Sequence, residues 1–285
     1  LSELFGSKPA YADTVNPTQR IDNSHINIKS DVDGVLQLLK SHENEIPNIY
    51  FDTDGNATGG IGTLIKEADI KNNRIWSLPG EEQEDLLNSI KTLGPLFSGT
   101  GVFNNTAGHR QRALFKSLID NNGVRGNIHL TPEQLEAVKT VFKYELTPQQ
   151  ATDLVYNYYE DTKGALVKYL NDNNLSWDEM NPRVRHLVLD RLYNVGSDRL
   201  QKFTSLAKAI KNNDYLGIGK QTKTIGAGAV RNNFNRLYAL PELAGTDALT
   251  LRNQVEKVGN TLLTPENFDT YKHLFNVTSN ILQPY

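Results

Sequence analysis

The sequence of 285 residues contains no cysteine. This absence excludes disulfide bonds, thiol catalysis and zinc sites built on cysteine. The six histidines show no HExxH or other ligand spacing, so we expect neither a metal site nor a cofactor. No run of about 18 apolar residues is present, which argues against a membrane-spanning helix. The front of the chain also lacks a signal-peptide pattern. Because the chain begins at Leu1 and not at Met, we expect a fragment or a processed product.

The chain also lacks an excess of positive charge. Its net charge of −3 argues against a general nucleic-acid binder. The charge is nevertheless uneven, because the stretch from Arg199 to Leu240 holds eight Lys and Arg residues and a single acid, Asp214. Such a stretch is typical of a solvated helical surface, or of a basic lobe that faces an anionic polymer. The sequence leaves both interpretations open.

The distribution of apolar residues predicts a mostly helical protein. Residues 1–30 are polar and predict an extended N-terminal arm, and a helix follows from near Ser30. Helical patterns recur through the rest of the chain, and two of them open on Thr-Pro capping boxes at Thr131 and Thr147. Strand signals gather only near residues 49–64, and no strand–helix alternation suggests a parallel sheet. We therefore predict the α+β class, predominantly α, with one small β-hairpin sheet.

The end of the first helix carries an acidic residue on its apolar side. Residues 32, 36, 39 and 43 are spaced by four, three and four, so Glu43 continues the apolar stripe of this helix. Partial burial and the negative end of the helix dipole would both disfavour its ionised form. A carboxylic acid that holds its proton near neutral pH is what a general acid requires. Taken alone, a solvated Glu at a frayed helix end is the better interpretation.

The predicted hairpin follows directly, with Asp54-Gly55 as its turn signal. A two-residue turn would pair Asp52 with Ala57 and put Thr58 on the opposite face. A three-residue turn over residues 54–56 would instead pair Asp52 with Thr58 on one face, where the two side chains could hold one water. The sequence does not choose between these turns.

Three glycines follow the turn, although glycine weakens strands. Gly59, Gly60 and Gly62 would be explained by close approach of a helix or of a bulky ligand, or by a twisted and bulged edge strand. We predict that Gly60 and Gly62 line the substrate site.

The stretch "HENEIPNIYFDTDGNATGGIGTLI", residues 42–65, combines these features. It resembles the catalytic region of the T4-type phage lysozymes, whose pattern is a Glu, a Y-x-D-T-x-G hairpin and then T-x-G-x-G. The spacing matches without gaps through Gly62, with Glu43 nine residues before Asp52 and fifteen before Thr58. The resemblance implies that Glu43 is the general acid, that Asp52 positions and activates a water, and that Thr58 assists this water.

The resemblance covers residues 31–64 and 146–240. The stretch "LTPQQATDLVYNYYEDTKGALVKYL" is similar to the long helix that joins the two lobes of these enzymes. "LVLDRLYNVG", "FTSLAKAIKNNDY" and "GAGAVRNNFNRLYAL" are similar to parts of their C-terminal lobe. There Asn194 takes the place of a polar side chain that faces the sugar chain. The resemblance therefore implies a two-lobed, lysozyme-like fold in which Asn194 contacts substrate.

The chain departs from the family in three respects. Thr63 stands where the family usually has a structural His, which bears on stability more than on activity. Residues 65–145 are far longer than the family's connection and imply an inserted helical subdomain, and residues 241–285 are an extra helical extension. The predicted organisation is thus an arm over 1–30 and a lysozyme-like domain over 31–285. Such elaborations resemble the lysozyme-like killing domains of bacteriocins such as pesticin and of secretion-delivered effectors.

The activity that the resemblance implies is that of a muramidase, which hydrolyses the β-1,4 bond between N-acetylmuramic acid and N-acetylglucosamine in peptidoglycan. Such a domain acts in the periplasm or cell wall of a target bacterium. Its implied partners are glycan strands and an immunity or inhibitor protein. Two alternatives stay open: a lytic transglycosylase, which needs Glu43 but neither Asp52 nor Thr58, and a non-catalytic cell-wall-binding module on the lysozyme fold.

Overall fold

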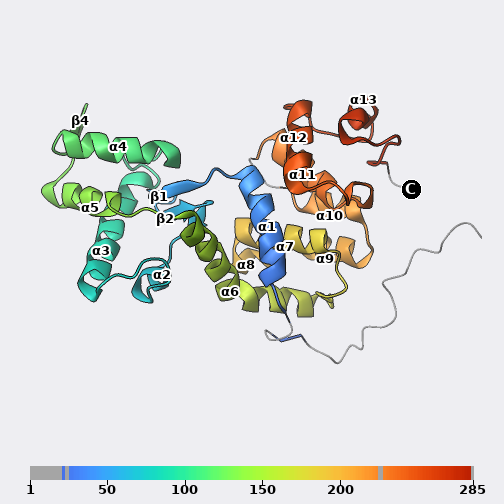
Figure 1. Ribbon diagram of the computed structural model, residues 1–285, viewed down its shortest axis with the longest axis horizontal. Coiled ribbons are helices and arrows are strands. Elements are labelled where there is room, and N and C mark those ends of the chain that lie inside the picture. The colour runs from blue at the N-terminus through green and yellow to red at the C-terminus, as the bar shows by residue number, and fades with distance from the viewer. Residues whose placement is uncertain (1–20, 23–25, 224–226, 284–285) are drawn as a thin grey trace, which may run out of the picture. The chain divides into compact units, whose positions relative to one another are not determined.

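The computed structural model describes residues 21–22, 26–223 and 227–283, and Figure 1 shows the path of the chain. These residues are mostly helical and form two small antiparallel sheets. The predicted class, α+β and predominantly α, is therefore confirmed. The chain divides into two compact units, one of residues 43–160 and the other of residues 1–42 together with 161–285. Within the described residues, no helix combines the length and the apolar character needed to cross a membrane.

The unit of residues 43–160 holds both sheets and the helices packed around them. Its elements in chain order are β1 (Ile46–Phe51), β2 (Ala57–Gly60), β3 (Thr63–Leu64), α2 (Glu67–Lys71), α3 (Gly80–Phe97), α4 (Gly108–Asp120), β4 (Val124–Arg125), β5 (Ile128–His129), α5 (Pro132–Phe142) and the first half of α6 (Pro148–Asp172). Residues 65–145, expected to form an inserted helical subdomain, thus belong to the same compact unit as the hairpin.

An aromatic cluster joins the first strand to the helices of this unit. Phe51 of β1 stacks on Phe97 of α3, with 4.9 Å between ring centroids. Phe97 in turn contacts the rings of Phe103 and Phe115. All four rings are buried, and α5 lies between α3 and α4 beside them (Figure 1). These ring contacts therefore anchor β1, which ends one residue before Asp52, to the core formed by the helices of this unit.

The expectation of a single hairpin sheet is wrong in two ways. The first sheet has three strands in the order β1-β2-β3, because Thr58 and Gly59 of β2 also pair with β3. A second, two-stranded sheet is formed by β4 and β5. Its turn is Gly126-Asn127, and Gly126 has a φ of 60°, a value that favours glycine. A Gly-Asn pair with a β-branched residue two positions before the Gly and one directly after the Asn, Val124 and Ile128, was the signal that could have predicted this hairpin.

A glutamine side chain occupies the outer edge of β1. The Phe51 backbone N–H donates to Gln111 Oε1 at 2.8 Å, and Gln111 Nε2 donates to the Phe51 carbonyl at 2.7 Å. Gln111 Nε2 also donates to the Thr106 carbonyl at 3.0 Å. Since Gln111 is 0% exposed, its amide takes the place of a pairing strand at Phe51, while residues 145 and 146 pair with the same strand at Pro47 and Asn48.

We expect Gln111→Ala to lower the free energy of unfolding of this unit by about 2–6 kcal/mol. The substitution leaves the buried N–H and C=O of Phe51 without partners, and each such group costs about 1–3 kcal/mol. Urea unfolding followed by circular dichroism measures the change. Gln149→Ala, at an exposed position of α6, is the matched control and should change stability by less than about 0.5 kcal/mol. Equal stabilities of the two variants would contradict the role given to Gln111.

In the other compact unit, the secondary-structure elements of the described residues are all helices. Its elements are α1 (Lys29–His42), the second half of α6, α7 (Pro182–Val195), α8 (Ser197–Leu200), α9 (Thr204–Lys211), α10 (Tyr215–Gln221), α11 (Ala229–Tyr238), η2 (Pro241–Leu243), α12 (Ala248–Val258), α13 (Phe268–Tyr271) and η3 (Lys272–Phe275). The predicted apolar stripe of α1 is buried, and α1 packs against α7 and α12. Figure 1 shows α1 crossing α7.

A buried ion pair and a glycine join α1 to α7. Asp31 is 4% exposed and accepts a hydrogen bond from Arg185 Nε at 2.8 Å. Gly34 faces the ring of His186 so closely that a Cβ on Gly34 would lie 2.1 Å from it. Burial lowers the pKa of His186 to about 4, so this ring is neutral at neutral pH.

The predicted arm over residues 1–30 lies largely outside the described residues. At its end, Ile26 and Ile28 are buried at 1% and 2% exposure. The first helix begins at Lys29, one residue before the predicted Ser30. The last part of this segment therefore contributes to the core of its unit.

Candidate functional site

The turn of the hairpin spans three residues, but it is neither of the two turns that the sequence left open. The Asp52 N–H donates to the Asn56 carbonyl, and the Gly55 N–H donates to the Asp52 carbonyl, both at 3.0 Å. Gly55 has a φ of 81°. The turn residues are thus 53–55, so neither proposed pairing of Asp52, with Ala57 or with Thr58, is correct.

The turn is held in this form by a helix of the same unit. A Cβ on Gly55 would lie 2.4 Å from the Gly94 carbonyl oxygen, and a Cβ on Gly94 would lie 2.7 Å from the Gly55 carbonyl oxygen. Neither position accepts a side chain, because backbone atoms cannot move aside as a flexible side chain can. The backbones of the turn and of α3 therefore meet at two glycines.

Asp52 and Thr58 lie on the same face of the hairpin despite the changed register. Tyr50 pairs with Thr58 across the two strands. Since side chains alternate along a strand, Tyr50 and Asp52 share a face, and Thr58 lies on that face opposite Tyr50. Thr58 is 5% exposed, and its Oγ1 donates to the Asn56 carbonyl at 3.2 Å, so the oxygen lone pairs stay available as acceptors.

The Asp52 carboxylate is oriented by its own turn. Its Oδ1 accepts the backbone N–H groups of Asp54 at 2.9 Å and Asn56 at 2.8 Å. Its Oδ2 accepts the Asn56 side-chain amide at 3.1 Å. A carboxylate offers about four acceptor sites. Three are used here, so Oδ2 can accept one further donor, such as a water molecule.

The hydroxyl of Tyr50 is influenced by the charges of both predicted acidic residues. Burial raises the pKa of its hydroxyl to about 12, and the nearby carboxylates of Glu43 and Asp52 contribute to the same shift. An influence of both carboxylates on one hydroxyl requires that both lie near it, because charge–charge effects decline with distance. Glu43 directly follows the last residue of α1 and is partly exposed. The structure therefore gathers Glu43, Tyr50 and Asp52 within one unit.

The glycines behind the turn are explained by a helix and by backbone conformation. Gly60 has a φ of 59°, and a Cβ there would lie 2.8 Å from the Cβ of Ala151 in the first turn of α6. Gly62 has a φ of 80° and lies close to the Tyr50 hydroxyl, which would be 3.8 Å from a Cβ. Of the explanations offered by the sequence, close approach of a helix thus accounts for Gly60 without a ligand.

We expect Gly60→Ala to lower the free energy of unfolding by about 2–4 kcal/mol. A left-handed conformation costs an L-residue about 1 kcal/mol, and crowding against Ala151 adds about 1–3 kcal/mol. Gly126→Ala is the matched control, since Gly126 has a φ of 60° and open space where a Cβ would lie. Denaturant titration of both variants separates the cost of the left-handed conformation, which both share, from the cost of crowding, which only Gly60→Ala has. Equal losses would mean that the approach of α6 contributes nothing.

Asn194, predicted to contact substrate, lies in the other unit and is exposed at the end of α7. Its amide Nδ2 donates to the Asp190 carbonyl at 2.6 Å and to Asp190 Oδ1 at 3.0 Å, while its Oδ1 accepts from Arg231 at 3.0 Å. Burial raises the pKa of Asp190, and Arg231 opposes that shift. Both amide hydrogens of Asn194 are therefore used within the protein, and only its carbonyl oxygen can accept another hydrogen bond.

The basic stretch between residues 199 and 240 is largely a surface feature. Six of its eight cations have exposed side chains: Arg199, Lys202, Lys208, Lys211, Lys220 and Lys223. None of the six forms an ion pair with the described part of the chain. Of the other two, Arg231 bonds Asp190 and Arg236 donates to the Leu263 carbonyl. Both interpretations of the stretch, a solvated surface and a face for an anionic polymer, agree with this arrangement.

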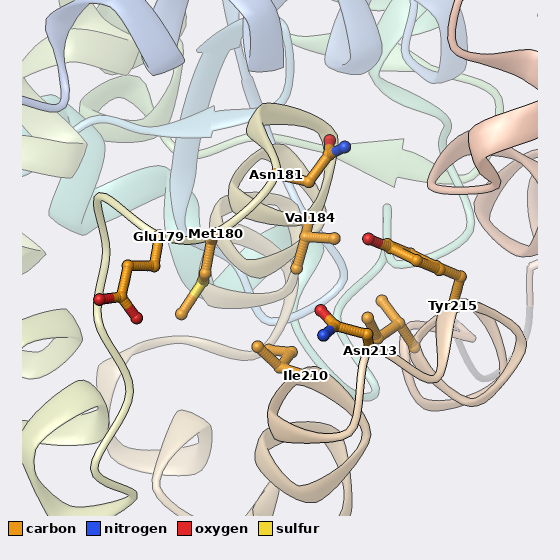
Figure 2. A pocket seen from close by; sticks show the side chains of 8 residues that line it. Glu179, Met180, Asn181, Val184, Ile210, Asn213 and Tyr215 are labelled. Atoms are coloured by element: carbon orange, nitrogen blue, oxygen red, sulfur yellow. The ribbon is translucent and has the colours of Figure 1, made fainter. Parts of the chain in front are cut away.

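A small pocket in the unit that contains residues 161–285 lies between the start of α7 and the turn from α9 to α10 (Figure 2). Asn181, Val184 and Tyr215 are among its lining residues. Its volume is about 10 Å³, room for roughly one water molecule. It contains none of the predicted site residues and is too small for a sugar.

Comparison of this chain with protein-family models, curated proteins and solved structures finds no match. The assignment of the site therefore depends on the residues and their geometry alone.

Sequence reasoning missed three residues that build the site. Tyr50 was part of the quoted motif but received no role, although its alternation with Asp52 places both on one face. Asn56 was considered only as a turn residue, and its amide proves to hold Asp52. Gln111 gave no signal at all, because its partner Phe51 lies sixty residues earlier.

Proposed function

We propose that this chain is a peptidoglycan hydrolase of the muramidase type, similar in mechanism to the T4-type phage lysozymes. The observation that carries the proposal is the arrangement on one hairpin face, where Asp52 and Thr58 both present acceptor oxygens and Glu43 lies near Tyr50 beside them. These are the residue types needed to protonate a leaving group and to direct a water. The gapless spacing of the motif supports the same assignment.

In the proposed reaction, Glu43 donates its proton to the glycosidic oxygen as the bond between that oxygen and the anomeric carbon breaks. A water molecule donates hydrogen bonds to Asp52 Oδ2 and Thr58 Oγ1, which directs its lone pair at the anomeric carbon. The new C–O bond forms as the water gives its proton to Asp52. An inverting route of this kind needs carboxyl groups roughly 6.5–9.5 Å apart, while about 5–5.5 Å would correspond to a nucleophilic carboxylate.

The proposal extends to the setting in which such an enzyme works. Its substrate is the glycan strand of a bacterial cell wall, in the periplasm or wall of a target cell. The chain would then be the wall-degrading part of an antibacterial toxin or effector, and an immunity protein would be its natural inhibitor. The exposed cations between residues 199 and 223 suit a polymer that carries carboxylates.

Mass spectrometry of the soluble products released from purified peptidoglycan tests the proposal. We expect muropeptides with an intact, reducing muramic-acid end. Anhydro-muramyl products would refute the muramidase proposal and identify a lytic transglycosylase, in which Glu43 acts without a directed water. Absence of soluble products from a chain that still sediments with the wall would replace it by a binding module.

A further inference from the structure

A second pocket of the unit 43–160 adjoins Asp52. Its volume is about 230 Å³. On one side it is lined by β1 and the turn, including Asp52 and Thr53, and on the other by the end of α3 and the connection to α4. No residue of β2 lines it, so it lies at the outer edge of β1. This wall comes from residues 97–108, within the segment 65–145 that is expected to be far longer than the corresponding connection of the T4-type phage lysozymes.

The wall of this pocket is held in place by hydrogen bonds. The Phe103 N–H donates to the Leu96 carbonyl at 2.7 Å, and the Thr106 N–H donates to the Phe103 carbonyl at 2.9 Å. The Thr106 carbonyl accepts from Gln111, which also holds β1. Phe103 itself packs on Phe97 and is 4% exposed. Because these contacts exist without a ligand, binding here would require little ordering of the chain.

The lining of the pocket combines apolar and neutral polar groups. The ring of Tyr50 and the side chain of Ala107, with Phe97 and Phe103 behind them, form its apolar part, while Thr53, Asn104 and Thr106 supply two hydroxyls and an amide. Asn104 Nδ2 donates to the Gly99 carbonyl, and within the described residues no hydrogen bond reaches Asn104 Oδ1. The lining therefore offers an unused acceptor and hydroxyl donors beside an apolar surface.

We propose that this pocket receives the acetamido group of an N-acetylated sugar unit of the glycan strand, an inference that rests on the proposed function. The group's N–H matches Asn104 Oδ1, its carbonyl matches the hydroxyl of Thr106, and its methyl matches the exposed apolar side chain of Ala107 in the same lining. The volume, below the roughly 300–1,000 Å³ of ordinary ligand sites, suits one ring and its substituent. Its described lining residues include no cation and one carboxylate, that of Asp52, so the pocket disfavours the anionic stem peptide.

The test is calorimetric titration of the Glu43→Gln chain, which should not cleave its ligand, with a hexamer of N-acetylglucosamine and with the same hexamer after removal of its acetyl groups. We expect Asn104→Ala to weaken binding of the acetylated hexamer about tenfold, from the loss of an amide hydrogen bond. Binding of the deacetylated hexamer should not change. Asn105→Ala is the matched control, since Asn105 is exposed on the same segment and does not line the pocket.

Thr106→Val, which removes the hydroxyl at nearly constant volume, provides a second variant should Asn104→Ala disturb the loop. Equal affinity of Asn104→Ala, Thr106→Val and Asn105→Ala for the acetylated hexamer would overturn the pocket assignment. If the wild-type chain still released reducing muropeptides, the proposed function would stand without it. Conversely, if binding depended on Asn104 but the wild-type chain released no soluble products, the pocket assignment would stand and the proposed muramidase activity would be refuted. A chain that neither binds the hexamer nor hydrolyses the wall would refute both.

Discussion

Glu43→Gln is expected to reduce the release of reducing muropeptides from peptidoglycan by about 10²–10⁴-fold, the usual contribution of general acid catalysis. The substitution preserves the size of the side chain but removes the proton that the leaving oxygen would receive. Because Glu43 is partly exposed and lies outside α1, the fold should survive the change. The rate of appearance of reducing ends, measured at saturating substrate, reports the loss.

Glu45→Gln is the matched control for this experiment. This substitution makes the same chemical change two residues later in the chain, where Glu45 is exposed on the same connection. Its activity should stay within about twofold of the wild-type rate, because surface substitutions rarely disturb the fold. A folded Glu43→Gln chain that is as active as Glu45→Gln would remove Glu43 from the mechanism.

Asp52→Asn is expected to reduce kcat by about 10²–10⁴-fold with little change in stability. The Asn side chain keeps an oxygen that can accept the N–H groups of Asp54 and Asn56, so the turn should persist. It lacks the negative charge needed to take a proton from the attacking water. The initial rate of wall hydrolysis and the thermal unfolding midpoint together separate catalysis from folding.

Two further variants distinguish the chemical role of Asp52 from its role in the turn. Asp54→Asn changes an exposed acid in the same turn and should leave the rate unchanged. Asp52→Ala removes the acceptors of three hydrogen bonds and should also lower the free energy of unfolding by about 1–3 kcal/mol. Full activity of Asp52→Asn would show that this carboxylate only stabilises the hairpin.

Much of the helical architecture could be predicted because its signals are local. The capping box at Thr131 forms as expected. The Gln134 backbone N–H donates to the Thr131 hydroxyl, and the Thr131 backbone N–H donates to Gln134 Oε1. Thr147 and Gln150 form the same pair at the start of α6. Both boxes involve residues three positions apart, so the amino-acid sequence contains all the partners.

The hairpin marks the limit of such local reasoning. The Asp-Gly pair correctly predicted a turn, but not which residues pair across it. The register depends in addition on Gly94, which meets Gly55 from a helix about forty residues later. A one-residue difference in turn position changes every cross-strand partner, although here Asp52 and Thr58 still share a face.

The sequence by itself thus determined the predominantly helical class, the helix starts and the residue types at the candidate catalytic positions. Only the tertiary structure decided the register of the hairpin, the need for Gly60 beside Ala151, the edge contact of Gln111 and the pocket beside Asp52. The physical reason is the separation of the partners along the chain. Helix caps and turns are satisfied within a few residues, whereas close packing and buried backbone groups are satisfied by whichever distant segment the folded core brings into contact.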